Sequence, residues 1–174
     1  RYLDGVSSLW VNVHGHGRPE IDRAIKAQLG KIAHSTLLGL GNTPSIELAE
    51  RLSGIAPKGL GRVFFSDNGS TAVEIALKMS FQYWEQKGFE GKRKFIAFTG
   101  AYHGDTFGAM SVGARGVLTS PYQPMLFTVD YLPFPAPGRE QHTIDAFARL
   151  LRKSGNEIAA LILEPLVLGA GGML

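Results

Sequence analysis

The chain has 174 residues, of which 44% are hydrophobic and 19% charged, and its formal net charge is +3. This composition is that of a folded domain with a sizeable core. Its basic residues are scattered except for the run Lys92-Arg93-Lys94, so we expect no nucleic-acid footprint, and no apolar stretch is long enough to span a membrane. The absence of cysteine excludes disulfides, thiolate metal sites and cysteine nucleophiles, and no metal site is predicted.

Apolar runs of strand length alternate with helix-patterned segments along the chain. This order is typical of an α/β sheet with helices on its faces. Helices are predicted at residues 19–32 and 43–54, from residue 69 or 70 to the glycine at 88, and at residues 143–153. Strands are predicted at residues 62–66, 94–99, 126–131 and 158–163.

The turn that leads into the third predicted helix is suited to bind a phosphate. Polar turn residues follow the apolar run at 63–65, and Thr71 and Glu74 have the spacing of a capping box. The first N–H groups of a helix lack partners, and the helix dipole favours an anion there. Gly69 lets a ligand approach the backbone closely, and Ser70 adds a hydroxyl donor. An ordinary capped turn between a strand and a helix has the same pattern.

A second group of polar residues follows the predicted strand at 94–99. Tyr102, His103 and Asp105 lie together on a loop at the end of this strand, where functional sites concentrate. A planar cofactor held by its phosphate needs a flat partner, and Tyr102 can supply one by stacking. The alternative is a turn with a packed tyrosine and a histidine bonded to backbone. Glu164 ends the last predicted strand, whose carboxyl end would face the same crevice.

Three segments, SDNGSTAVEIALKM, GAYHGDTFGAMSV and LEPLVLGAGGM, together resemble the class III pyridoxal-phosphate aminotransferases. The resemblance extends over nearly the whole chain. It implies an α/β fold, the large domain of a fold-type I PLP-dependent transferase, with a mainly parallel sheet and flanking helices, here incomplete. Residues 1–42 would contribute to the small domain and the substrate pocket, and residues 43–174 would form the first part of the PLP-binding large domain.

The resemblance also implies roles for five residues near the cofactor, pyridoxal 5'-phosphate. Gly69 and Ser70 would bind its phosphate, and Tyr102 would pack on its pyridine ring. His103 belongs to the same motif as Tyr102 and would help to hold the loop at the cofactor. Glu164 would lie beneath the cofactor, where we expect a structural role rather than proton transfer.

The substrate pocket would contain an aromatic pair. Trp10 matches a family tryptophan that lines this pocket, and Tyr102 would shape the pocket with it. The alternative for Trp10 is an ordinary core aromatic residue. The sequence departs from the family at Leu168, where the family usually has glutamine, so a polar contact is missing or supplied elsewhere.

The resemblance implies a ping-pong transamination in biotin synthesis. An amino group would pass from S-adenosylmethionine, or from lysine as another donor, to 8-amino-7-oxononanoate, giving 7,8-diaminononanoate. We expect a cytoplasmic homodimer that binds small-molecule substrates. The Schiff-base lysine of the family would lie beyond Leu174, so we expect this chain to be an amino-terminal part that is inactive by itself.

Two alternatives stay open. The first is another class III aminotransferase, acting on an ω-amine such as ornithine or 4-aminobutyrate. The second is a catalytically inactive scaffold that binds an anion or a partner, which the absence of the Schiff-base lysine would favour.

Overall fold

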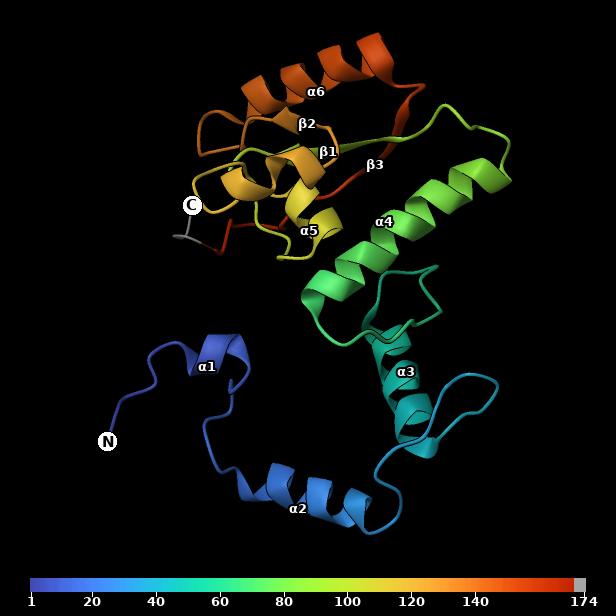
Figure 1. The fold of residues 1–174 in the computed structure, drawn as a ribbon, viewed down its shortest axis with the longest axis vertical. Helices are drawn as coiled ribbons and strands as arrows, with labels where there is room; N and C mark the ends of the chain where they lie inside the picture. The colour runs from blue at the N-terminus through green and yellow to red at the C-terminus, as the bar shows by residue number, and fades with distance from the viewer. Residues whose placement is uncertain (171–174) are drawn as a thin grey trace. The chain divides into compact units, whose positions relative to one another are not determined.

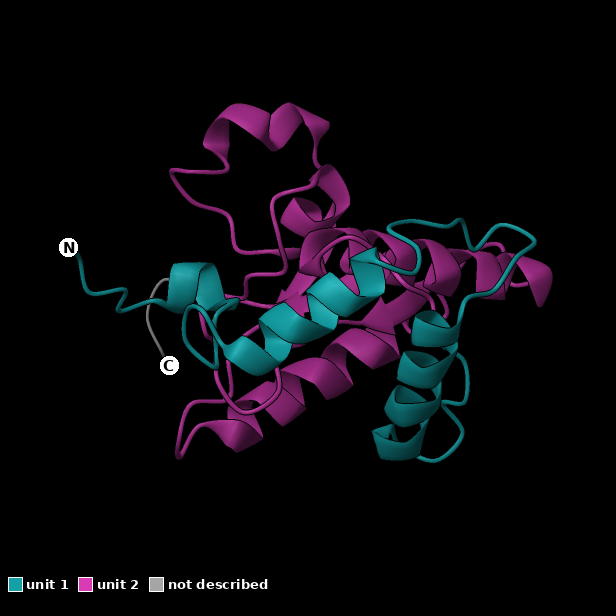
Figure 2. Ribbon diagram, turned by 90° about the horizontal axis from the view of Figure 1, so that it is seen from below, with its two compact units in different colours: residues 1–63 teal, residues 64–174 magenta. Residues whose placement is uncertain are grey.

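The computed structural model describes residues 1–170, and the chain divides into two compact units at Val63 and Phe64 (Figure 2). Unit 1 is Arg1–Val63, and unit 2 begins at Phe64. The predicted boundary after residue 42 concerns the domains of a whole enzyme and stays a prediction. No helix among residues 1–170 is long and apolar enough to cross a bilayer.

Unit 1 contains the helices α1 (Ser7–Trp10), α2 (Pro19–Leu29) and α3 (Thr43–Ile55), none of which has a buried residue. Both predicted helices are present. Helix α2 starts with proline and carries acidic residues in its first turn, which suits the positive end of the helix dipole. It ends three residues earlier than predicted, before Gly30, whereas α3 continues through Gly54 to Ile55.

Helix α1 is a left-handed turn. Its four residues have φ between 48° and 68°, a conformation that costs roughly 1–2 kcal/mol per residue. The Asp4 carboxylate accepts hydrogen bonds from the Ser8 N–H (3.0 Å) and the Ser8 hydroxyl (2.8 Å), and it lies 2.7 Å from His16 Nε2. These bonds, first that from the Ser8 N–H, hold the pKa of Asp4 well below its usual range. Asp4 therefore braces the strained turn from outside.

Unit 2 is built on a parallel sheet of three described strands in the order β2-β1-β3, which confirms the predicted α/β class. The strands are β1 (Lys94–Phe98), β2 (Val129–Leu132) and β3 (Ile158–Leu161). β2 begins three residues later than predicted, and β3 ends two residues earlier. The prediction of a strand at residues 62–66 is wrong. An apolar run becomes a strand only when a neighbouring strand pairs with it, and among residues 1–170 none does.

Helices cover both faces of this sheet (Figure 1): α4 (Gly69–Gln86), α5 (Phe107–Val112) and α6 (Glu140–Ser154). Side chains of β1 alternate between the faces. Ile96 and Phe98 face one core cluster, on which α6 packs, and Phe95 and Ala97 face a second cluster, to which α4 and α5 contribute. A short 3₁₀ helix, η1 (Ser120–Met125), precedes β2. Burial on both faces explains why β1 is a continuous apolar run.

The start of α4 differs in detail from the prediction. Asn68 is the N-cap: its side chain accepts a hydrogen bond from the Thr71 N–H (3.0 Å), and its N–H donates to Thr71 Oγ1 (3.1 Å). The capping box therefore joins Asn68 and Thr71, and the predicted box of Thr71 with Glu74 is wrong. Because the helix begins at Gly69, Glu74 lies in its second turn, too far along to cap it.

Candidate functional site

Three segments far apart in the sequence meet at one edge of the sheet in unit 2. They are the first turns of α4, the loop that follows β1 and the residues that follow β3. Ser70 is hydrogen-bonded to Thr106 of the loop, and the Tyr102 N–H of the same loop donates to Glu164 (2.8 Å). The strands are parallel, so their carboxyl ends share an edge, and this edge is where α/β folds bind ligands.

The start of α4 presents two free backbone donors. Within residues 1–170, no acceptor bonds the N–H of Gly69 or of Ser70, whereas Thr71 and Ala72 donate to Asn68. Gly69 is exposed, and a Cβ built on it has no atom within 4 Å. Two oriented donors at an open helix start form a site that suits an anion.

The Ser70 hydroxyl is engaged with the loop after β1. Its oxygen accepts a hydrogen bond from the Thr106 N–H (3.0 Å) and lies 2.8 Å from Thr106 Oγ1. Thr106 Oγ1 donates its own proton to Glu74 Oε1 (2.6 Å), so Ser70 is the donor in the hydroxyl pair. The proton of Ser70 is thus already shared with Thr106, and the donors left for an anion are the backbone N–H groups. Phosphate binding by this hydroxyl stays a prediction.

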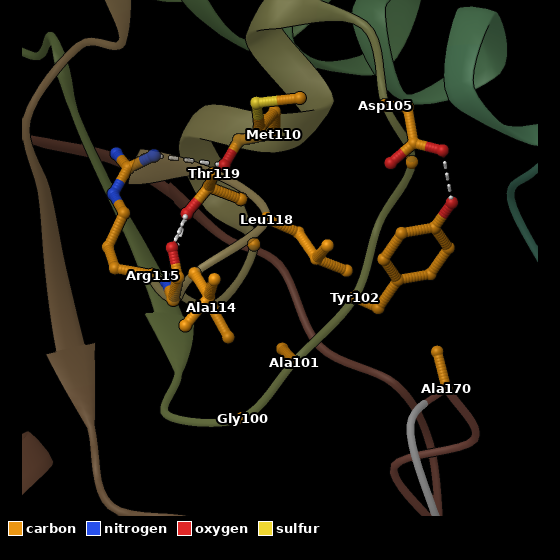
Figure 3. A pocket seen from close by; sticks show the side chains of 14 residues that line it. Gly100, Ala101, Tyr102, Asp105, Met110, Ala114, Arg115, Leu118, Thr119 and Ala170 are labelled. Atoms are coloured by element: carbon orange, nitrogen blue, oxygen red, sulfur yellow. Dashed lines mark hydrogen bonds between the residues drawn. The ribbon is translucent and has the colours of Figure 1, made fainter. Parts of the chain in front are cut away.

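Tyr102 lies at the rim of a cavity, with 41% of its surface exposed. Its hydroxyl donates to Asp105 Oδ2 (2.9 Å), as Figure 3 shows. Burial raises the pKa of this hydroxyl, and the hydrogen bond to Asp105 raises it further. Tyr102 therefore keeps its hydroxyl proton, which it donates to Asp105.

His103 has a buried ring nitrogen without a hydrogen-bond partner. Nε2 is enclosed, and no atom of the described residues bonds to it. Burial lowers the pKa of the imidazole, and the Glu164 carboxylate opposes this in part, so the ring is neutral at pH 7. Buried polar atoms in proteins are almost always satisfied, so this nitrogen indicates a polar group that the described part of the chain does not contain.

Glu164 bonds only backbone groups in the described part of the chain. Oε1 accepts from the Tyr102 N–H, and Oε2 accepts from the Gly169 N–H (2.7 Å). The carboxylate thus ties the loop after β1 to the segment after β3, and its place beneath the cofactor stays a prediction. Leu168 is buried against the core cluster of Ile96 and Phe98. Its side chain therefore belongs to the core of the described structure.

A cavity of about 420 Å³ opens beside Tyr102 (Figure 3). Its walls come from the loop after β1 and from residues 110–119, with Met110 and Leu118 contributing apolar surface. The Arg115 guanidinium donates to three backbone carbonyls, so it holds the wall together. Residues 113–119 lie outside the three family segments and have no motif or periodicity that indicates a pocket, so their place in this wall could not be predicted.

Trp10 belongs to unit 1 and is 62% exposed. The alternative of a buried core aromatic residue does not hold for the described structure. Its role in the substrate pocket stays a prediction.

The predicted role of Glu74 in capping its own helix is wrong. Its side chain bonds the start of α5 instead of the start of its own helix. The sequence did indicate the correct face, because Ser70 and Glu74 are four residues apart and therefore lie on the same side of the helix.

The sequence matches the family described as Aminotransferase class-III over residues 1–174. The adenosylmethionine-8-amino-7-oxononanoate aminotransferase of Nitratidesulfovibrio vulgaris is 53% identical, and the match covers 100% of this chain and 34% of that protein. The aminotransferase of the same name from Geobacter sulfurreducens is 48% identical, with 100% and 41% covered. The chain thus spans well under half the length of these relatives.

Solved structures agree with this assignment. The adenosylmethionine-8-amino-7-oxononanoate aminotransferase of Methanocaldococcus jannaschii superposes with a TM-score of 0.92 at 46% identity, covering 99% of this chain and 39% of that one. An amine transaminase from an uncultivated Pseudomonas species, in a PLP-bound form, superposes with a TM-score of 0.89 at 38% identity. The match covers 98% of this chain and 41% of that one. The described part of the chain therefore has the α/β fold of PLP-dependent transaminases.

Pyridoxal phosphate, the cofactor expected of this family, fits the residues present. Two free N–H donors at the start of α4 suit its phosphate, and Tyr102 and the orphaned His103 nitrogen follow β1 at the same edge of the sheet. On its sequence and its fold, the chain belongs to the class III aminotransferases.

Proposed function

We propose that the full-length protein transfers an amino group from S-adenosylmethionine to 8-amino-7-oxononanoate, forming 7,8-diaminononanoate in biotin synthesis. One observation carries the proposal. Eight relatives, 40–53% identical over 98–100% of this chain, have the name of this aminotransferase.

Pyridoxal phosphate supplies the electron sink for amino transfer when it is bound. In this proposal, the N–H groups of Gly69 and Ser70 would hold its phosphate, and Tyr102 would stack on its ring. The buried His103 Nε2, which has no partner among the described residues, would form a hydrogen bond with a polar group beside it. Glu164 keeps the loop in place through the Tyr102 N–H. The residues of this chain therefore bind and orient, and no proton transfer is assigned to them.

The cavity beside Tyr102 supports a substrate with a long methylene chain. Its wall is largely apolar, with Met110, Val117 and Leu118 among the lining residues. The chain of 8-amino-7-oxononanoate is apolar between its polar ends, and an apolar wall favours such a chain through burial. Asp105, which fixes the Tyr102 hydroxyl, provides a polar point at the rim.

The assembly and the location belong to the same proposal. We propose a homodimer in which Trp10 lines the substrate pocket, and a cytoplasmic location that follows from the biosynthetic role. Sedimentation of the full-length protein at micromolar concentration tests the dimer, and a monomer there contradicts it.

Solved transaminases favour a second candidate, an aminotransferase for other amines. The amine transaminase from the uncultivated Pseudomonas species is 38% identical, and an omega-transaminase from Thermomicrobium roseum is 32% identical with a TM-score of 0.85. Ornithine or 4-aminobutyrate would then be the amino donor.

A comparison of amino donors, each given separately, distinguishes the two candidate functions. The full-length protein with pyridoxal phosphate is given 8-amino-7-oxononanoate and one donor at a time: S-adenosylmethionine, lysine, ornithine or 4-aminobutyrate. Mass spectrometry measures 7,8-diaminononanoate. We expect the diamine with S-adenosylmethionine and none in a reaction without a donor. Turnover of ornithine or 4-aminobutyrate with another ketone, without any diamine, would overturn the proposal in favour of the second candidate.

A further inference from the structure

Glu74 makes an unusual set of contacts for a side chain in the second turn of a helix. One oxygen, Oε1, accepts three hydrogen bonds: from Thr106 Oγ1 (2.6 Å), the Gly108 N–H (2.6 Å) and the Ala109 N–H (3.1 Å). The side chain is half-buried, and both backbone donors belong to buried residues. All three donors belong to a segment more than thirty residues later in the chain.

The start of α5 depends on this carboxylate. Thr106 is the N-cap of α5 but makes no capping bond with its own side chain. Glu74 satisfies two of the first N–H groups instead, and its negative charge suits that end of the helix. Gly108 permits the contact, because a Cβ there would lie 2.7 Å from Glu74 Cδ. Any larger residue would push the carboxylate away.

A second contact lies one turn earlier on the same face of α4. Ser70 exchanges two hydrogen bonds with Thr106, and a Cβ on Gly104 would lie 2.8 Å from Ser70 Cα. Two glycines thus allow two close approaches between the helix and the segment Gly104 to Ala109. Tyr102 and His103 directly precede this segment, and Ser70 bears one of the free N–H groups. The two contacts therefore join the anion donors to the aromatic loop.

We propose that Glu74 is a positioning residue that, together with Ser70, fixes the loop bearing Tyr102 relative to the phosphate donors of α4. The role in cofactor binding rests on the proposed function. Because one oxygen accepts all three bonds, an acceptor at this place is the main requirement, and the negative charge adds to it. Glu74→Gln keeps an acceptor of the same reach, whereas Glu74→Leu removes it and leaves the Gly108 and Ala109 N–H groups without a partner, while the Thr106 hydroxyl can still donate to Ser70.

The test uses the full-length protein and a matched control on the same helix. Glu85→Leu makes the same substitution at a side chain that contacts Arg93 at 3.3 Å. Hydrogen exchange of peptides covering residues 104–112 measures the loop, and titration of the apoprotein with pyridoxal phosphate measures the dissociation constant. In Glu74→Leu we expect exchange of the Gly108 and Ala109 amides, and the dissociation constant, each to rise roughly tenfold or more. Glu74→Gln should stay near the parent in both, and Glu85→Leu should equal it.

The outcomes separate this proposal from the proposed function. A parent that does not bind pyridoxal phosphate overturns the proposed function, while the exchange result still decides whether Glu74 holds the loop. Parental exchange in Glu74→Leu overturns the proposal, and so does faster exchange with an unchanged dissociation constant. If Glu74→Leu does not fold, Thr106→Val takes its place, since it removes the hydroxyl bonds to Ser70 and Glu74 at similar volume. Parental exchange and cofactor affinity in that variant overturn the proposal equally.

Discussion

Gly104 is the position where a single methyl group should disturb the site most. Its φ of +127° is a conformation that side chains rarely adopt, and a Cβ would lie 2.8 Å from Ser70 Cα. The obstructing atom is backbone at the start of α4, so it cannot swing aside as a flexible side chain does. We therefore expect Gly104→Ala to separate the loop from the first turn of α4.

The loss in the free energy of unfolding of Gly104→Ala has two contributions. The backbone conformation costs an alanine on the order of 1–3 kcal/mol. Forcing a methyl into a filled space costs about another 1–3 kcal/mol. Together they predict a loss of roughly 2–6 kcal/mol in the free energy of unfolding. Gly138 isolates the first part, since its φ is +78° and a Cβ there has no atom within 4 Å. Gly138→Ala should cost only about 1–2 kcal/mol.

Urea unfolding of the full-length protein, followed by circular dichroism, compares the two variants. Gly104→Ala should have the lower midpoint, and it should also bind pyridoxal phosphate more weakly than Gly138→Ala, because only Gly104 touches Ser70. Equal midpoints and equal cofactor affinities in the two variants would refute the reasoning, since they would mean that the close approach to Ser70 carries no energetic weight.

Three further predictions concern single side chains of the site. Tyr102→Phe should keep the absorbance of bound cofactor but raise the KM for the ketone, whereas Tyr102→Ala should also weaken cofactor binding through loss of about 0.5–1.5 kcal/mol of ring pairing. If Tyr102→Ala binds the cofactor and turns over like the parent, Tyr102 only anchors the loop. Burial lowers the pKa of His103 below its unfolded value of about 6.5, so the unfolded state binds the proton more readily. The free energy of unfolding should therefore fall as the pH drops below 6.5, and it should fall less in His103→Gln. A proton NMR titration of His103 with a midpoint at or above 6.5 would contradict this prediction. Leu168→Ala should lower the free energy of unfolding by about 2–5 kcal/mol in a urea series, because Leu168 is 1% exposed in the core; a loss below 1 kcal/mol would place it outside the core.

Local pattern accounts for much of the secondary structure. The apolar run of β1 was recognisable because both faces of the strand are covered, and α2 because proline and acidic residues mark its first turn. Pattern alone failed at residues 62–66, which also contain an apolar run but pair with no described strand. Strand formation depends on a distant partner, and a local run does not contain that information.

The sequence by itself determined the family and the parts of the candidate site: a helix start with Gly69 and Ser70, an aromatic loop with Tyr102, and a strand end with Glu164. These are recognisable because each depends on neighbouring residues only. The tertiary structure alone decided how the parts are joined. It shows that the Ser70 proton goes to Thr106, and that Glu74 holds the start of α5 instead of capping its own helix. Such bonds link residues more than thirty positions apart, and the choice of partner depends on which donors folding brings within 3 Å, which spacing along the chain does not specify.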